Sequence, residues 1–214
     1  MTVEGKRTYR SGLREAQARQ TRTLIVSAAA ALFVELGFGA TTIQAVADAA
    51  GVSRKTVFSS VGGKVELIKL AYDHAIGGDD EPISMRDRPQ VQQLRATNDP
   101  ATMLDRLAAV ITDANARIAG IYRALQGAAE IDTEARALFE DLQRQRLTGA
   151  RFHAEHLAAL GALRQDLTVD LAVDIVWLYL DPTPFHQLVE QRGWTPARYQ
   201  TWLSNALQAQ LLPD

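Results

Sequence analysis

Helical periodicity runs through almost the whole of this chain. Apolar residues recur three or four positions apart, and no segment alternates apolar and polar residues as a half-buried strand does. Glycine and proline interrupt the pattern where helices end or begin, for example at Gly37, Gly51, Pro100 and Gly161. The sequence therefore predicts an all-α fold.

Composition narrows the class of protein. Of 214 residues, 47% are hydrophobic and 22% are charged, which is ordinary for a soluble globular protein. No apolar run reaches the roughly 18 residues of a membrane span, and the polar, basic start Met1–Arg10 is unlike a secretory signal. Without cysteine the chain has no disulfide, thiolate metal site or cysteine nucleophile. We expect a cytoplasmic protein.

Charge is distributed unevenly along the chain. Residues 1–70 contain ten lysine and arginine residues and five acidic ones, a net charge of +5. The rest contains 13 basic and 20 acidic residues, a net charge of −7. This asymmetry indicates a basic module that meets a polyanion and an acidic module that does not, although a basic terminal segment is also typical of a solvated arm.

Breaks in the pattern divide the chain into four parts. We expect a flexible basic arm over residues 1–18, a helical domain over 19–78, a linker over 79–98 and a second helical domain over 99–214. In the second domain, helices are expected to begin at or near five positions: Pro100, Ile121, Thr133, Thr168 and Thr195.

The segment Thr41–Ser60 predicts a helix-turn-helix. It reads as a short helix closed by Gly51 and a second short helix capped by Ser53. Thr41 and Gln44 fit a capping box for the first helix. A second helix of this kind fits the major groove of DNA. Its outward residues all carry hydrogen-bonding groups: Ser53, Arg54, Lys55, Thr56 and Ser59.

Cations at the starts of helices support a DNA contact. Arg54 and Lys55 occupy the first turn of the second short helix, and Lys64 begins the next helix. The helix dipole disfavours a cation there by about 0.3–1 kcal/mol, whereas a phosphate opposite would compensate. One such cation is tolerated anywhere on a surface, so the argument depends on three occurring together.

A specific pattern of residues extends from Arg22 to Leu70. It consists of Ala28-Ala29, Leu32-Phe33, Glu35, Gly37, Thr41-Thr42, Ala50-Gly51-Val52-Ser53, Lys64 and Leu67. With this pattern the stretch resembles the DNA-binding domain of TetR-family regulators. The resemblance implies phosphate contacts from Thr42 and Lys64, and groove contacts from Gln44 together with the basic residues and threonine of the second short helix, Arg54, Lys55 and Thr56.

One position departs from the family pattern. The family usually has tyrosine followed by histidine or asparagine where this chain has Phe58, Ser59 and Ser60. Phe58 cannot donate a hydrogen bond to phosphate. Either Phe58 only packs against its neighbours, or Ser59 or Ser60 takes over the contact.

In this family the second domain binds an inducer and forms the dimer. The segment Leu171–Leu180 is apolar on nearly every face, and the last helix carries a broad apolar stripe. We expect a homodimer with a two-fold helical interface, although burial within one subunit is the alternative. The expected interface residues are Leu171, Ile175, Trp202, Leu203, Ala206 and Leu207.

A pocket in this domain is expected to be largely apolar. Ordinary core packing is the alternative for each of its candidate residues. No cofactor is expected, and no metal, because His153 and His156 have no evident third ligand. The candidates for ligand contact are Met103, Leu107, Ile111, Tyr122, Leu125, Phe139 and Trp177.

These features together predict a sequence-specific regulator of transcription. It binds a palindromic operator and is a repressor released by a small, mainly apolar inducer, with an activator of the same fold as the alternative. A helical enzyme is the remaining class. The sequence has no nucleophile elbow, and Gly62-Gly63-Lys64 lacks the leading glycine and the hydroxyl residue of a P-loop.

Overall fold

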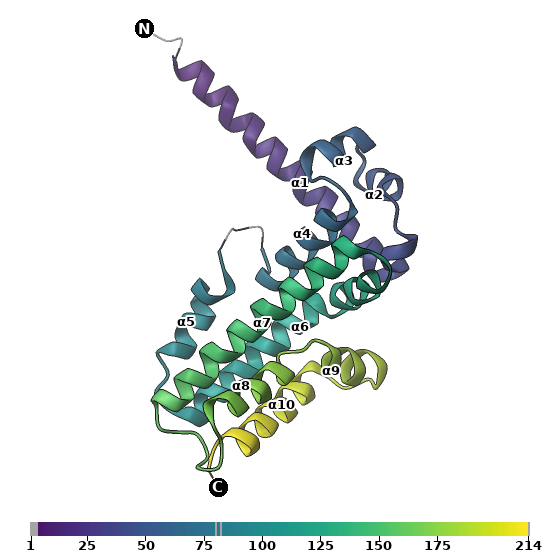
Figure 1. Ribbon diagram of the computed structural model, residues 1–214. Helices are drawn as coiled ribbons and strands as arrows, with labels where there is room; N and C mark the ends of the chain where they lie inside the picture. Colours follow the sequence, from purple (N-terminus) through teal and green to yellow (C-terminus); the bar gives the residue numbers. More distant parts are fainter. Residues whose placement is uncertain (1–3, 80, 82, 214) are drawn as a thin grey trace.

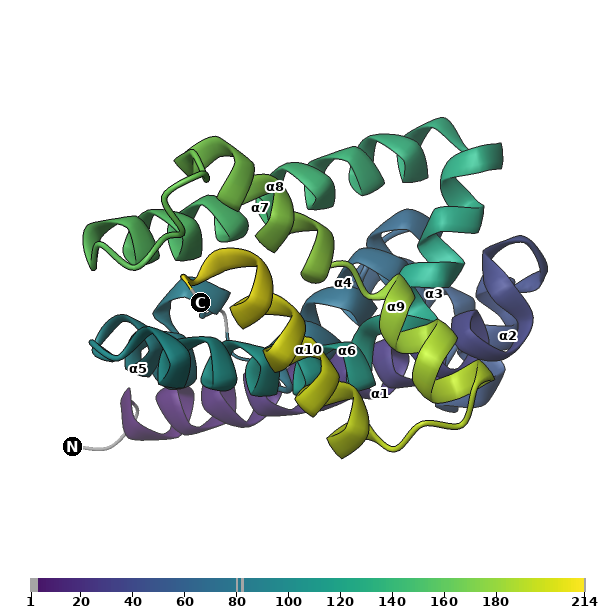
Figure 2. The same cartoon turned by 90° about the horizontal axis from the view of Figure 1, so that it is seen from below.

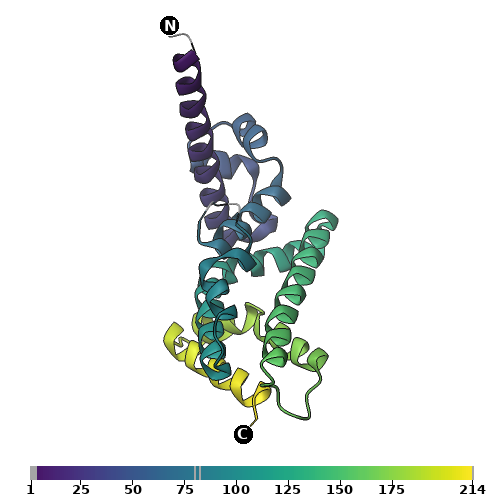
Figure 3. The same ribbon diagram turned by 90° about the vertical axis from the view of Figure 1, so that its left-hand side faces the viewer.

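The structure is a computed structural model that describes residues 4–79, 81 and 83–213. Within this part the regular elements are all helices, which confirms the all-α prediction (Figure 1). The molecule is elongated, with a small helical head at one end and a larger helical body at the other (Figure 3).

Four helices build the head: α1 (Glu4–Ala40), α2 (Ile43–Ala50), α3 (Arg54–Ser60) and α4 (Lys64–Gly77). Their apolar faces enclose one core, to which α1 contributes Ile25, Val26 and Phe33. Leu24 and Leu36, which share the helical spacing in the sequence, are exposed instead. The other three helices each add fully buried residues: Val46, Ala47, Val57, Leu67 and Ile68.

Helix α1 is longer than the sequence led us to expect. The described backbone is helical from Glu4, where a flexible arm was predicted over residues 1–18, and this first half projects beyond the rest of the molecule (Figures 1 and 3). The physical reason is local, because residues 14–20 are arginine, glutamate, glutamine and alanine, which are strong helix formers. Gly37 breaks the helical conformation near the end, with a φ of 77°.

The stretch Arg14–Ala40 of this helix is long and apolar enough to cross a membrane by length and composition alone. Core helices of soluble proteins meet the same criterion. Here Ile25, Val26, Ala29 and Phe33 lie in the core of the head. Burial in that core accounts for part of the apolar character of the stretch, since 28% of its most apolar window is buried.

The body contains the remaining elements. The expected linker includes a 3₁₀ turn (Met85–Asp87) and a short helix, α5 (Pro89–Arg95), whose Val91 and Leu94 are buried. Two long helices follow, α6 (Pro100–Ile131) and α7 (Thr133–Ala159), so the helices expected separately at Pro100 and Ile121 are one. The chain ends with four shorter elements: α8 (Val169–Tyr179), α9 (Thr183–Phe185), a π-helical turn (His186–Gln191) and α10 (Pro196–Leu211).

In the body, each of the two long helices packs against a shorter helix from the end of the chain. Seen from below, α8 lies beside α7, and α10 lies against α6 (Figure 2). Helix α6 also extends into the head, where it packs against α1 and α4. It is therefore the element that joins the two parts of the molecule.

Arg117 ties α4 to α6. Its Nε donates a hydrogen bond to the carbonyl of Ala75 at 2.7 Å, and its Nη2 donates to the carbonyl of Ile76 at 3.2 Å. These are carbonyls of the last turn of α4, which have no partner within the helix. One charged side chain of the body thus caps the helix that follows the helix-turn-helix.

Candidate nucleic-acid interface and ligand cavity

Helix α2 begins with a threonine cap. The hydroxyl of Thr42 accepts a hydrogen bond from the amide of Ala45 at 3.0 Å. Thr41 is buried and donates to the carbonyls of Leu32 and Gly37, so the predicted capping box of Thr41 with Gln44 is wrong. Gln44 is exposed and donates to Asp48 at 2.7 Å.

The turn between α2 and α3 has the features that a helix-turn-helix requires. Gly51 closes α2 in the left-handed conformation with a φ of 67°. Ser53 caps α3 by accepting a hydrogen bond from the amide of Thr56 at 3.0 Å. Ala47 and Val57 are fully buried where the two helices meet. The outer face of α3 is therefore held in a fixed orientation.

That outer face is polar and positively charged. Arg54, Lys55 and Ser59 are exposed, and within the described part of the chain neither cation forms an ion pair with a carboxylate. Phe58 is 50% exposed, so about half of its side chain is covered by its neighbours and the other half faces solvent. The two basic side chains remain available to an anionic partner.

Lys64 lies between the helix-turn-helix and α1. Its Nζ donates to the carbonyl of Gly39 at 3.3 Å and lies 4.2 Å from the ring centroid of Phe38. Burial lowers the pKa of Lys64, while the charge of Asp132 raises it. Glu66 accepts from the amide of Gly63 at 2.9 Å, so the first turn of α4 also carries the acid that a helix start favours.

Comparison with known proteins identifies this region. Residues 25–71 match the model of the bacterial regulatory proteins of the tetR family. This segment matches the DNA-binding domain of that family. The matched residues run from the core of α1 through the helix-turn-helix into α4. The match indicates a domain that binds DNA in the regulation of transcription.

Solved structures of regulators share the fold of about nine tenths of this chain. NalD of Pseudomonas aeruginosa, the secondary repressor of a multidrug efflux pump, has a TM-score of 0.64 and 20% identity, over 92% of this chain and 98% of its own. The ketosteroid regulator KstR2 of Mycobacterium tuberculosis has a TM-score of 0.57 and 20% identity, over 90% of this chain and 95% of its own. The fatty acid degradation regulator FadR of Bacillus halodurans has a TM-score of 0.64 and 16% identity, over 87% of this chain and 93% of its own. No curated protein sequence matches the chain.

The body of the protein contains a cavity of about 930 Å³. It lies among α4, residues 81–88, α5, α6 and α7, and most of its exposed lining is apolar. Leu107 and Ile111, two of the residues expected to contact a ligand, line it. Neighbouring apolar residues missing from that expectation are Ile76, Val91, Ile118, Leu142 and Phe152.

The other five candidates for ligand contact do not line this cavity. Met103 and Leu125 are fully buried among other apolar side chains. Tyr122 packs on Phe139, with their ring centroids 5.5 Å apart. Trp177 lies under the guanidinium of Arg146, at 4.4 Å. For these residues core packing, the alternative interpretation, describes the structure.

Three polar residues of the cavity were not predicted as ligand contacts. Asn115 on α6 and His153 on α7 are both buried. Arg146 on α7 is nearly buried and forms an ion pair with Asp181. The pocket was expected to be largely apolar, so these polar residues were not among its candidates. His156 Nε2 lies 3.4 Å from the carbonyl of Thr97, to which it donates in the tautomer that carries its proton on Nε2. No group of three metal-ligating side chains occurs among the described residues.

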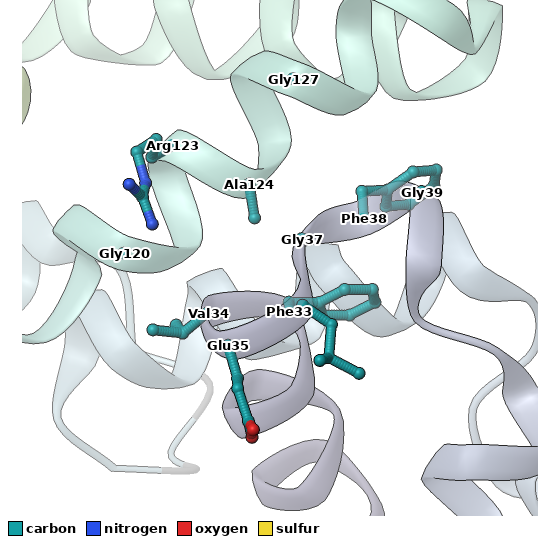
Figure 4. A pocket seen from close by; sticks show the side chains of 11 residues that line it. Phe33, Val34, Glu35, Gly37, Phe38, Gly39, Gly120, Arg123, Ala124 and Gly127 are labelled. Carbon is teal, nitrogen blue, oxygen red and sulfur yellow. The ribbon is translucent and has the colours of Figure 1, made fainter.

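A smaller hollow of about 460 Å³ lies where α1 meets α6 (Figure 4). Val34, Gly37 and Phe38 line it from α1, and Gly120 and Ala124 line it from α6. A Cβ at Gly120 would lie 3.0 Å from the side chain of Val34, so glycine permits the two helices to approach closely here. The hollow lies at the junction of head and body.

The expected dimer residues divide into two groups. Leu203 and Leu207 are fully buried inside the subunit, so the prediction that they form the interface is wrong. They lie on the inner side of α10, where it packs against α6. Leu171 is 47% exposed. Ile175, Trp202 and Ala206 are partly buried.

Proposed function

We propose that this protein is a homodimeric repressor that acts in the cytoplasm, binds a palindromic operator and is released by a small, mainly apolar ligand. The observation that carries the proposal is the outer face of α3. Arg54 and Lys55 are exposed there beside the Ser53 cap, on a helix whose inner side is fixed by Val57. Such a helix presents its N-terminal residues to base edges in the major groove.

Residues flanking α3 complete the proposed contact with DNA. Thr42 and Gln44 are exposed at the start of α2, and Ser59 is exposed at the end of α3. We assign Thr42 and Lys64 to phosphates, and Gln44, Arg54, Lys55 and Thr56 to the groove. Phe58 is exposed enough to contact a thymine methyl or a sugar instead of donating to phosphate.

The proposed route of release runs through α4. Tyr72, Asp73, Ile76 and Gly77 of this helix line the cavity, and Lys64 at its other end adjoins the helix-turn-helix. A ligand that fits the cavity better when α4 is displaced would change the spacing of the two α3 helices. It can shift this equilibrium only by its difference in affinity for the two states.

Repression is the simplest mode for such a protein. A dimer that covers promoter DNA blocks transcription without any further contact. NalD, one of the proteins with this fold, is itself named a repressor. An activator would need an additional surface for the transcription machinery.

The test is selection of bound duplexes from a random pool by the full-length protein. We expect palindromes whose half-sites are about one helical turn, ~34 Å, apart. Transcript levels from the selected promoter, with and without the protein, then distinguish repression from activation. No preference for any palindrome over scrambled competitor at physiological salt contradicts the proposal.

A further inference from the structure

The cavity in the body has more hydrogen-bond donors than the protein satisfies. Four residues of its lining have a buried side-chain nitrogen with donor capacity left over in the described part of the chain; the amide of Asn115 also interacts with the hydroxyl of Tyr199, but it has two N–H groups. No residue of the same lining, within that part, has a buried oxygen in this condition. Buried polar groups are normally paired, so the missing acceptors point to a bound molecule. The four atoms are Arg88 Nε, Asn115 Nδ2, Arg146 Nε and His153 Nδ1.

Two of these donors are uncharged and deeply enclosed. Asn115 on α6 is 2% exposed and His153 on α7 is 7% exposed. Burial lowers the pKa of His153 to about 4, and the nearby His156 acts in the same direction, so the imidazole is neutral at physiological pH. In the tautomer that carries its proton on Nδ1, His153 is a donor like the amide of Asn115.

Two of the three cations of the cavity already face carboxylates. Both terminal nitrogens of Arg88 donate to Asp79, at 2.8 and 2.9 Å, and Arg146 is paired with Asp181. Arg86 is exposed, and its guanidinium lies 5.4 Å from the ring centroid of Phe152. Three acids, Asp73, Glu81 and Asp87, also line the cavity.

An anionic ligand would therefore find little uncompensated positive charge. Burying a carboxylate without such a partner is costly. A neutral acceptor avoids this cost. A carbonyl oxygen, with two lone pairs, can accept from two donors at once.

We propose that this cavity binds a neutral carbonyl compound, with a mainly apolar body and a ketone or ester oxygen that accepts hydrogen bonds from Asn115 and His153. The volume of about 930 Å³ is at the upper end of the roughly 300–1,000 Å³ of small-molecule pockets. The inference rests on the proposed function only in taking this ligand as the one that regulates DNA binding. The binding chemistry itself can be tested without DNA.

The experiment compares three probes of similar shape on the full-length protein by titration of its tryptophan fluorescence. The probes are 4-phenylcyclohexanone, the hydrocarbon phenylcyclohexane and the anion 4-cyclohexylbenzoate. In the unaltered protein we expect the ketone to bind at least about tenfold more tightly than the anion. The ratio of ketone to hydrocarbon affinity is the second readout, because it cancels the apolar contribution.

Two variants test the assigned donors. Asn115→Leu and His153→Phe keep the branched or ring shape of the side chain and remove the donor, so each should lower the ketone-to-hydrocarbon ratio by up to about tenfold. Asn98→Leu, at an exposed asparagine outside the cavity, is the matched control and should leave the ratio unchanged. If one variant does not fold, the proposal is still tested by the ratio in the other variant and by the affinities of ketone and anion for the unaltered protein.

Three outcomes overturn the inference: the anion binds as tightly as the ketone, the ratio is the same in the unaltered protein and in both variants, or the ketone does not bind. Operator binding is measured on the same preparations. Loss of operator binding with the ketone preference intact would overturn the proposed function and leave this inference standing.

Discussion

At the scale of single residues, substitution of Arg54 tests whether α3 contacts the edges of bases. Arg54 is exposed on the first turn of that helix. If its guanidinium contacts a base edge, Arg54→Ala should reduce discrimination at one base pair by about 1–3 kcal/mol. Equilibrium binding to the selected operator and its single-base variants measures this. Arg164→Ala, in the loop between α7 and α8, is the control, and equal effects of the two substitutions would contradict the assignment.

Lys64 tests the phosphate contact. Lys64→Ala should weaken binding to all sequences alike and reduce the slope of log affinity against log salt by about 1, because one fewer counterion is released. The variant also loses the hydrogen bond to Gly39, so thermal unfolding is recorded to separate stability from binding. Lys69→Ala, at an exposed lysine paired with Asp73, is the control. An unchanged salt slope for Lys64→Ala would refute the contact.

His153 should make stability depend on pH. Its pKa is lowered by burial to about 4 in the folded protein, against about 6.5 for a free histidine. The unfolded chain therefore binds a proton in this interval that the folded protein does not. The free energy of unfolding is highest above pH ~6.5 and should fall by at most about 1.4 kcal/mol per pH unit as the pH drops toward 4.

Denaturant unfolding between pH 5 and pH 8 checks this prediction. Carboxylates contribute little to the slope above about pH 5, because their ordinary pKa values are near 4. His153→Phe should flatten the slope in this window. A variant with the same slope as the unaltered protein would show that His153 is not the group responsible.

Residue identity and spacing predicted the helix-turn-helix better than the ligand cavity. The helix-turn-helix is local, so Gly51, Ser53 and Val57 specify it within one short segment. The choice between Thr41 and Thr42 as the cap depends on carbonyls of α1, which spacing does not reveal. The cavity depends on contacts among distant helices, and helical spacing cannot tell an apolar residue that faces a cavity from one that faces the core.

At the scale of whole elements, α4 is held by a side chain from α6. Arg117 is partly buried and donates to two carbonyls at the end of α4. Arg117→Met keeps the aliphatic part of the side chain and removes both bonds, so it should lower the free energy of unfolding by about 1.5–3 kcal/mol. Arg144→Met, at an exposed arginine of α7, is the control and should change stability by less than about 1 kcal/mol.

Comparing these two variants distinguishes a contact that holds the end of α4 from an ordinary interaction on the surface. Urea unfolding followed by circular dichroism provides the midpoint and the slope for each protein. If Arg117→Met and Arg144→Met have the same midpoint, the end of α4 does not depend on Arg117. In that case the proposal that α4 transmits ligand binding from the cavity to the helix-turn-helix would lose the contact that supports it.

Element boundaries were predicted well where a cap or proline marks them. Asp99 and Pro100 begin α6, and Thr168 caps α8, as expected. The linker was expected without helix because it is polar and rich in turn residues, yet α5 forms there with Val91 and Leu94 buried against the body. Two apolar residues in a polar stretch are too few to form a periodic signal, so only the tertiary contact identifies this helix.

At the scale of the whole molecule, the proposed dimer must place two α3 helices on one duplex. The head lies at one end of the subunit, and α8 and α10 lie in the body (Figure 1). Leu171 and Leu178 of α8 are 47% and 60% exposed, and isolated large apolar residues in this position are suited to a helical interface. Leu203 and Leu207 already serve the subunit core.

The double substitution Leu171→Glu with Leu178→Glu should therefore convert the dimer into a folded monomer. Burying carboxylates at a two-fold interface opposes association strongly, whereas both positions are solvated in the free subunit. Sedimentation at micromolar concentration measures the mass, and binding to the full palindrome should fall to the level of a single half-site. Ile131→Glu, at the 73% exposed last residue of α6, is the control and should remain dimeric. If the double variant sediments as a dimer, another surface joins the subunits, and the placement of both α3 helices must be derived from that surface instead.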